Sequence, residues 1–177
     1  MNSVDLDSLR FPVGKFTKPD LVIPEQIKVW IQEIKDLPGL LKIELSDLSL
    51  TDYDKTYRPG GWNIRQVIHH LADSHMNSFI RFKLALTEEK PIIKPYLEDR
   101  WSAMPDETML QPQVSLDILS GLHARWGFML DHMADTDFQK GFIHPEKNRF
   151  ITLEETTALY AWHCRHHLTH IRIAKHS

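Results

Sequence analysis

The chain has 177 residues, of which 42% are hydrophobic and 25% are charged, a composition typical of one globular domain with room for a core. The formal net charge is -3, and lysine and arginine are spread along the chain, so nothing electrostatic points to nucleic acid or an anionic membrane as a partner. The only cysteine, Cys164, excludes an internal disulfide and favours a reducing compartment.

Neither a secretion signal nor a membrane span is indicated. The N-terminal segment carries early aspartates and has no apolar h-region, and no apolar run approaches the roughly 20 residues needed to cross a bilayer. We therefore expect a cytoplasmic protein that forms a single domain over residues 1–177.

The first half of the chain contains two helical patterns. Residues 1–23 show no sustained apolar period and predict an extended arm. Over residues 24–45, apolar side chains recur every three or four residues and predict an amphipathic helix, which Pro38 should kink or briefly break. The polar residues 46–61 predict a loop, and a second helical pattern follows over residues 64–86.

The second half repeats this alternation of connections and helices. Residues 90–114 contain four prolines and predict a long irregular crossover between the second and third helices. A third helical pattern runs from Leu116 to about Ala134, and residues 135–151 form a connection with short extended pieces around Gly141–Ile143. The segment Thr152–Glu155 fits a capping box that starts a fourth helix, which ends near Lys175.

Four amphipathic segments of roughly 20 residues most simply form an all-α four-helix bundle. Such bundles can direct metal ligands inward from facing helices, so an unusual group of histidines in this chain could form a metal site. Four of the chain's 11 histidines lie in the segment 162–170, on the expected fourth helix.

These four histidines form two pairs with i, i+4 spacing, His163 with His167 and His166 with His170. Residues four apart lie roughly 40° from each other around a helix, so either pair can close on one metal ion. The helical projection places His163 and His167 at the border of the apolar face, and His166 and His170 toward solvent. An isolated pair of this kind is more often a set of surface groups, so a third ligand is required.

The second helix offers several candidates for the third ligand, and periodicity does not choose between them. His75 lies at the centre of the apolar stripe, where a hydrogen-bonded core histidine is the commoner interpretation, while His70 lies away from the stripe beside Asp73. His69 is a further candidate, and the pattern of residues leaves the choice open.

Two motifs in the right order resemble the DinB-like superfamily, and more narrowly its YfiT group of metal-dependent hydrolases: GGWNIRQVIHHLADSH and, far downstream, LYAWHCRHHLTHI. The resemblance implies an up-down-down-up bundle whose metal is held by His70, His163 and His167, in a chain that forms homodimers. Many relatives have Gln where this chain has His170, which makes His170 a candidate for supporting a ligand or contacting substrate.

Three imidazoles leave a divalent ion with an open position for water or substrate. Zinc is the expected metal, and nickel is the alternative. Metal-activated water would make the protein a hydrolase of small molecules, whereas a low-molecular-weight thiol bound at the same position would make it a bacillithiol-like S-transferase. A non-catalytic stress-response bundle with a structural metal is the third hypothesis.

Two further residues near the motifs receive expected roles. Asp73 follows His70 by one turn, so its carboxylate could orient a ligand imidazole or act as a base. Cys164 falls on the apolar stripe of the fourth helix, which favours a packed, unreactive thiol. The candidate catalytic groups are therefore Asp73 and His170.

Overall fold

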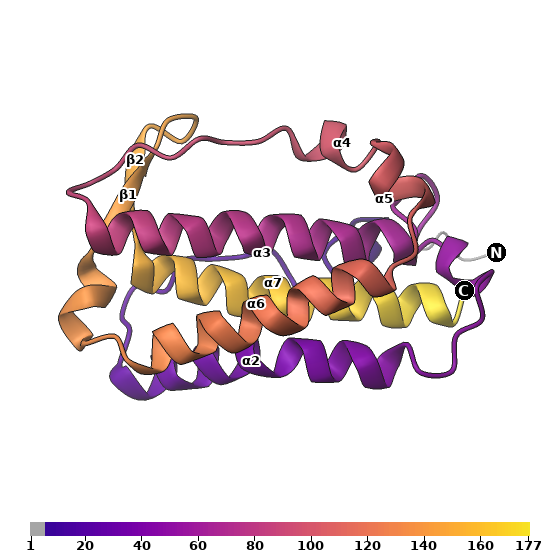
Figure 1. Cartoon of the computed structure of the whole chain (residues 1–177), viewed down its shortest axis with the longest axis horizontal. Helices are drawn as coiled ribbons and strands as arrows, with labels where there is room; N and C mark the ends of the chain where they lie inside the picture. Colours follow the sequence, from indigo (N-terminus) through magenta and orange to yellow (C-terminus); the bar gives the residue numbers. More distant parts are fainter. Residues whose placement is uncertain (1–5) are drawn as a thin grey trace.

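The computed structural model describes residues 6–177, and four long helices form a bundle. They are α2 (Pro24–Glu44), α3 (Ile64–Thr87), α6 (Gln113–Asp131) and α7 (Leu153–Lys175). Both α2 and α3 pack against α6 and α7, so α2 and α3 lie diagonally opposite each other. Figure 1 shows α3 and α6 running in one direction and α2 and α7 in the other, which confirms the predicted up-down-down-up bundle.

The crossover between α3 and α6 follows from this topology. Because the two helices point the same way, the chain must return along the full length of the bundle, and it does so on one side (Figure 1). The crossover is less irregular than predicted, since it forms two short helices, α4 (Glu98–Trp101) and α5 (Pro105–Met109). Pro105 occupies the start of α5, a position where its missing N–H leaves no helical bond unmade.

The connection between α6 and α7 contains the 3₁₀ helix η2 (Asp135–Gln139) and a hairpin of β1 (Gly141–His144) and β2 (Arg149–Thr152). The two strands are antiparallel, with Gly141 opposite Thr152. The extended pieces expected around Gly141–Ile143 are therefore confirmed, and they form a paired hairpin that the all-α description omits.

Side-chain caps fix the starts of the two helices that carry most of the histidines. Asn63 Oδ1 accepts a hydrogen bond from the Gln66 N–H (2.9 Å), and Gln66 Oε1 accepts one from the Asn63 N–H (3.2 Å). At α7, Thr152 Oγ1 accepts from the Glu155 N–H (3.1 Å). The Glu155 carboxylate instead accepts two bonds from Arg149, so only half of the predicted capping box forms.

Helix α2 continues through Pro38, where a kink or brief break was predicted, and the structure has no break there. The buried side chains Ile34, Leu37 and Leu41 hold the helix against the core on both sides of the proline. Proline has no N–H, so the carbonyl of Ile34, four residues earlier, lacks its usual helical donor. That carbonyl accepts a hydrogen bond from His123 Nδ1 of α6 at 2.6 Å instead.

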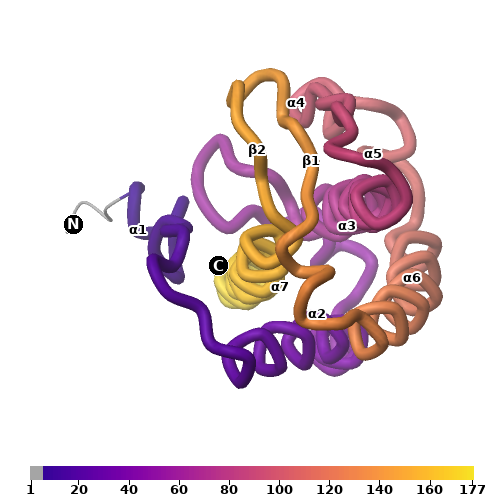
Figure 2. The backbone as a smooth tube through the Cα atoms, turned by 90° about the vertical axis from the view of Figure 1, so that its left-hand side faces the viewer, coloured from indigo at the N-terminus to yellow at the C-terminus, as the bar shows by residue number. Residues whose placement is uncertain are grey.

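The N-terminal arm covers part of α7. It begins with a short helix, α1 (Leu6–Arg10), which the prediction of an extended arm missed, and residues 1–5 lie outside the described residues. Figure 2 looks along the bundle and shows α1 on the outer side of α7. The Trp162 indole N–H donates to the Gly14 carbonyl at 3.0 Å, which ties the arm to α7.

The loop between α2 and α3 contains one more turn of 3₁₀ helix, η1 (Asp52–Asp54). Of the helices in residues 6–177, none combines the length and the apolar character needed to cross a bilayer.

Candidate metal centre

Three histidines from two helices converge between α3 and α7. One ring nitrogen from each of His70, His163 and His167 lies within 4.8 Å of the other two. His70 Nε2 and His163 Nε2 are 3.2 Å apart. Two nitrogens that each bind a tetrahedral zinc ion at about 2.0–2.1 Å lie about 3.3 Å from each other. The spacing of His70 and His163 therefore matches that of two ligands of one divalent ion, and the three rings are called the triad below.

The local geometry of each helix explains which histidines meet. His163 and His167 are one turn apart on α7, so their rings project to the same side. On α3, adjacent residues point about 100° apart, so only one of His69 and His70 can face α7. His69 faces the other way, where its Nδ1 accepts from the Ser115 hydroxyl (2.7 Å) and its Nε2 donates to the Leu110 carbonyl (3.2 Å).

Burial keeps the triad in the form that binds metals. It lowers the pKa of His70 to about 3, with a further contribution from His170. The pKa values of His163 and His167 also lie well below 6.5, first because both rings are buried and then because other imidazoles surround them. All three are neutral at neutral pH and keep a lone pair for a ligand bond.

A cavity of about 400 Å³ lies beside the triad and opens to solvent. Its walls come from the N-terminal arm, the loop before α3, the crossover helix α4 and α7 itself. The lining residues outside the triad include Arg10, Phe11, Tyr57, Arg58, Trp62 and Glu98. A small molecule can therefore reach His163 and His167, which also line the cavity, without passing through the helical core.

The sequence from residue 34 to residue 171 matches the DinB superfamily. The chain belongs to the DinB superfamily. It is 45% identical over 171 residues to the "Putative metal-dependent hydrolase YfiT" of Bacillus subtilis (strain 168), covering 97% of this chain and 94% of that protein. It is 49% identical over 166 residues to a "Putative metal-dependent hydrolase" of Bacillus cereus (strain B4264), covering 94% and 95% of the two chains.

A solved structure supports the same family assignment. The YfiT structure from Bacillus subtilis is described as a probable metal-dependent hydrolase with an unusual four-helix bundle topology. It superimposes on this DinB-superfamily chain with a TM-score of 0.90 at 45% sequence identity, covering 93% of this chain and 94% of the other.

The second pair on α7 of this DinB-superfamily protein is buried, contrary to the prediction that it faces solvent. His166 and His170 are only 7% and 2% exposed. The His166 ring stacks on Trp162 with centroids 4.4 Å apart, and the His170 ring stacks on Tyr57 at 3.8 Å. Segments outside the bundle cover a face that a helical projection of α7 alone assigns to solvent.

Burial of this pair creates a second set of close histidines. Ring nitrogens of His166, His167 and His170 also lie within 4.8 Å of one another. Because His167 belongs to both sets, the two sets compete for its ring. His170 Nδ1 lies 3.4 Å from His167 Nδ1, at the long limit of a hydrogen bond, so the second set directly contacts the triad.

The carboxyl group beside the triad is Glu98. Its Oε1 lies 4.0 Å from His70 Nδ1, and burial, followed by the nearby Asp99, raises its pKa. Asp73, the sequence-based candidate, does not line the cavity; burial and then Asp106 raise its pKa to about 6, and it in turn raises that of Glu107. Glu98 lies in the crossover, where no periodic pattern could have indicated it.

Cys164 lies in the core, with 3% of its surface exposed, and burial strongly raises the pKa of its thiol. A thiol of this kind is protonated at neutral pH and is a poor nucleophile and metal ligand. Its surroundings are those of the packed, unreactive cysteine expected from the apolar stripe.

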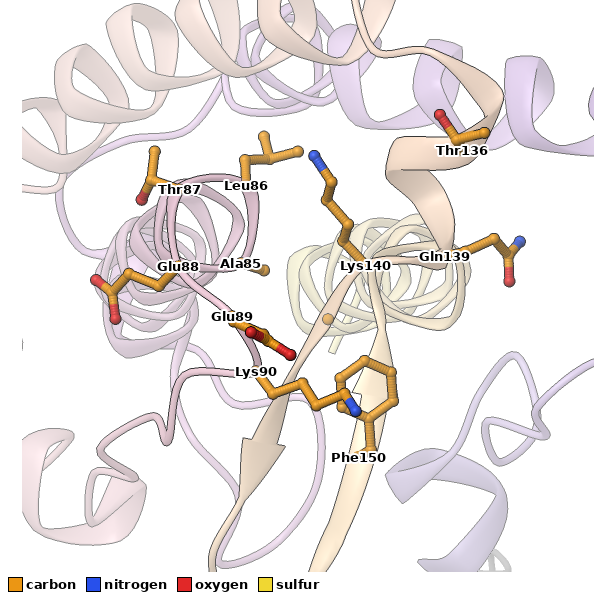
Figure 3. Close-up of a pocket in the computed structure, with 11 residues that line it drawn as sticks. Ala85, Leu86, Thr87, Glu88, Glu89, Lys90, Thr136, Gln139, Lys140 and Phe150 are labelled. Carbon is orange, nitrogen blue, oxygen red and sulfur yellow. The ribbon is translucent and has the colours of Figure 1, made fainter.

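A larger cavity of about 520 Å³ lies at the other end of α3 and is separate from the triad. Figure 3 shows it bounded by the C-terminal end of α3, η2 and the hairpin, with Lys140 and Phe150 among its walls. Leu86 in this cavity is 16 residues from His70 on the same helix, a distance of about 24 Å. None of its lining residues is a histidine, so it cannot serve the triad.

Proposed function

We propose that this protein is a metal-dependent hydrolase of a small molecule, with one divalent ion held by His70, His163 and His167. The observation that carries the proposal is the convergence of three neutral imidazoles beside an open cavity. The names given to its relatives support the same reaction class. Zinc is the proposed metal, with nickel as the alternative, since imidazole suits both.

A divalent ion in such a site supplies Lewis acidity and lowers the pKa of bound water. The protein's own part is to hold the ion with three neutral side chains and to leave one side open toward the cavity. Glu98 is the carboxylate placed to take up a proton there, because it lines the cavity and lies next to His70. Arg10 and Arg58 give the cavity a positively charged wall that can orient an anionic group of the substrate.

Metal analysis of the purified, untagged protein tests the proposal. We expect about one divalent ion per chain, lost after chelation, and no bound metal in the His163→Ala and His167→Ala variants. The matched control is His166→Ala, which removes a neighbouring buried histidine from the competing set and should keep the ion. Retention of metal by both triad variants, or its loss only in the control, would contradict the assignment.

The reaction class needs a separate measurement, because a low-molecular-weight thiol could occupy the same open position as a thiolate. Metal-loaded protein is incubated with ester, amide and phosphoester substrates, and in parallel with a small thiol plus an electrophile. Hydrolysis without thiol supports the proposal, whereas turnover that requires the thiol would make the protein an S-transferase. Unfolding on metal removal without any turnover would favour a structural metal.

We further propose a cytoplasmic homodimer. Large apolar side chains stand exposed on the outer faces of the bundle, among them Val29, Ile80 and Phe128. Light scattering during size-exclusion chromatography measures the mass directly, and a mass of about 21 kDa at micromolar concentration would contradict a dimer.

A further inference from the structure

A line of three histidines leads from the triad to the backbone of a helix that carries no triad residue. His163 Nδ1 lies 3.0 Å from His75 Nε2, and His75 Nδ1 lies 2.8 Å from His123 Nε2. His123 Nδ1 lies 2.6 Å from the carbonyl oxygen of Ile34 in α2. His75 and His123 are 0% and 2% exposed, so water does not compete for these contacts.

The carbonyl at the end of this line sets the direction of every bond in it. A carbonyl oxygen only accepts, so His123 must carry its proton on Nδ1. His123 is neutral, because burial lowers its pKa to about 4, and its Nε2 is therefore an acceptor. His75 must then donate from Nδ1 and accept at Nε2, and His163 must donate from Nδ1. The one nitrogen left with a free lone pair is His163 Nε2, which faces His70 Nε2 in the triad.

Pro38 explains why a helical carbonyl is available for this purpose. In an uninterrupted helix the Ile34 carbonyl would accept from the N–H of residue 38, and proline has none. The acceptor remains buried inside the bundle, where it needs a donor, and His123 supplies one. The proline thus leaves an acceptor of fixed position at the end of the line.

Packing holds the two middle rings in place. The His75 ring lies edge-on to Tyr160 and Trp126, with centroid distances of 5.1 and 5.9 Å, and is stacked on His123 at 4.9 Å. Rotation of either ring by half a turn would separate nitrogens that now lie within 3.0 Å of their partners.

We propose that His75 and His123 are positioning residues that fix His163 in the Nδ1–H tautomer, so that its Nε2 lone pair is directed into the metal site before any metal arrives. An unconstrained neutral imidazole can carry its proton on either nitrogen, and the Nε2–H form cannot bind through Nε2. The inference rests on the proposed function only where zinc affinity is measured, because the tautomers can be measured in the metal-free protein.

The tautomers are measured by ¹⁵N NMR of histidine-labelled, metal-free wild-type protein at pH 7.5. We expect protonated Nδ1 and unprotonated Nε2 in His163, His75 and His123. A His163 ring protonated on Nε2 would overturn the inference, whether or not the protein binds metal. Absence of metal binding together with the expected tautomers would overturn the proposed function and leave the positioning inference supported.

Variants then test the consequence for metal binding, by zinc titration against a chromophoric chelator. His75→Leu removes the acceptor for His163 and should weaken zinc binding by about 10–100-fold, the range for groups that orient ligand histidines. His75→Gln offers its amide oxygen where Nε2 was and should recover most of the affinity. Equal affinities for His75→Leu and wild type would overturn the inference.

A matched control in the same part of the core distinguishes a positioning role of His75 from a purely structural one. Trp126→Phe shrinks a fully buried ring that contacts both His75 and His123 but makes no hydrogen bond to either. It should lower the thermal midpoint while leaving the His163 tautomer and zinc affinity unchanged. If it weakens zinc binding as much as His75→Leu, packing and not the tautomer controls the site, and the inference is wrong.

Discussion

Two sides of α3 bury titratable groups, and they differ in what surrounds those groups. On the side facing α7, His70 and His75 lie against other imidazoles in a defined order of short contacts. On the side facing α5, burial and then Asp106 raise the pKa of Asp73 to about 6, and burial, Asp73 and Asp106 raise that of Glu107 to about 8. Desolvation is the largest cause of the pKa shift on both sides.

The comparison shows that burial alone does not define a site. A histidine that loses its charge gains a nitrogen lone pair that can bind a metal ion, whereas a carboxylate that loses its charge becomes an acid and a poor metal ligand. The histidine side also adjoins an open cavity, while Asp73 and Glu107 do not line that cavity. Perturbed pKa values mark functional sites only together with convergent geometry.

Acid should affect the histidine side most strongly. Each buried histidine has a folded pKa below its unfolded value of about 6.5, so its contribution to stability is intact above pH 6.5. As the pH falls below 6.5, the unfolded chain binds protons that the folded protein cannot, at up to ~1.4 kcal/mol per pH unit and group. The groups on this side are His70, His75, His123, His163, His166, His167 and His170, and His69 on the opposite side adds to them.

We therefore expect the free energy of unfolding of the metal-free protein to fall by several kcal/mol between pH 7 and pH 4.5. Asp73 and Glu107 oppose this trend, because a raised carboxyl pKa stabilises the folded state toward low pH, but they are fewer. Urea titrations at several pH values measure the slope. A flat or rising stability toward pH 4.5 would show that the imidazoles are not held neutral by burial.

Substitutions of Glu98 and Asp73 test whether a carboxyl group must lie beside the triad to affect activity, or whether a raised pKa on either side of α3 is enough. The Glu98→Gln variant should keep the bound metal and lower kcat by about 100-fold, a typical loss for an acid or base group. Asp73→Asn, on the other side of α3, should keep both metal and most activity. The comparison between the two sides would fail if Asp73→Asn were the more damaging change in steady-state kinetics.

Glu107 should respond in the opposite sense to the histidines. Its folded pKa of about 8 lies above its ordinary value of 4.5, so it stabilises the protein fully below pH 4.5 and loses that contribution as the pH rises through 8. Glu107→Gln should therefore raise the free energy of unfolding at pH 9 by about 1–2 kcal/mol and change it little at pH 5. Denaturant titrations at both pH values give the difference.

The sequence predicted the parts of this molecule that depend on a single helix. The i, i+4 spacing and the border of the apolar face favoured His163 and His167, and the structure places those rings together. The capping residue Thr152 placed the start of α7 correctly, because a cap depends on residues within one turn.

The remaining features depend on segments that meet only in the folded chain. His166 stacks on Trp162, one turn earlier on α7, and is also covered by Phe11 of the N-terminal arm, which no helical projection of α7 includes. Glu98 lies beside the triad on a crossover that has no periodic apolar pattern. From the sequence, Pro38 indicates only an interruption of α2. Its relation to His123 requires knowing that α6 packs on α2 beside that proline.

The triad and most of the cavity wall come from different parts of the chain, and this separation matters for engineering. The triad stands on two long helices inside the bundle, but much of the cavity wall comes from short segments laid over it, including Arg10 and Phe11 of the arm and Tyr57 and Arg58 of the loop. A library confined to Arg10, Phe11 and Arg58 would vary the shape and charge of the cavity, while the triad and the buried Tyr57, which stacks on His170, stay unchanged. Selection for new substrates could therefore change side chains of the arm and of the loop before α3 while the three histidines stay the same.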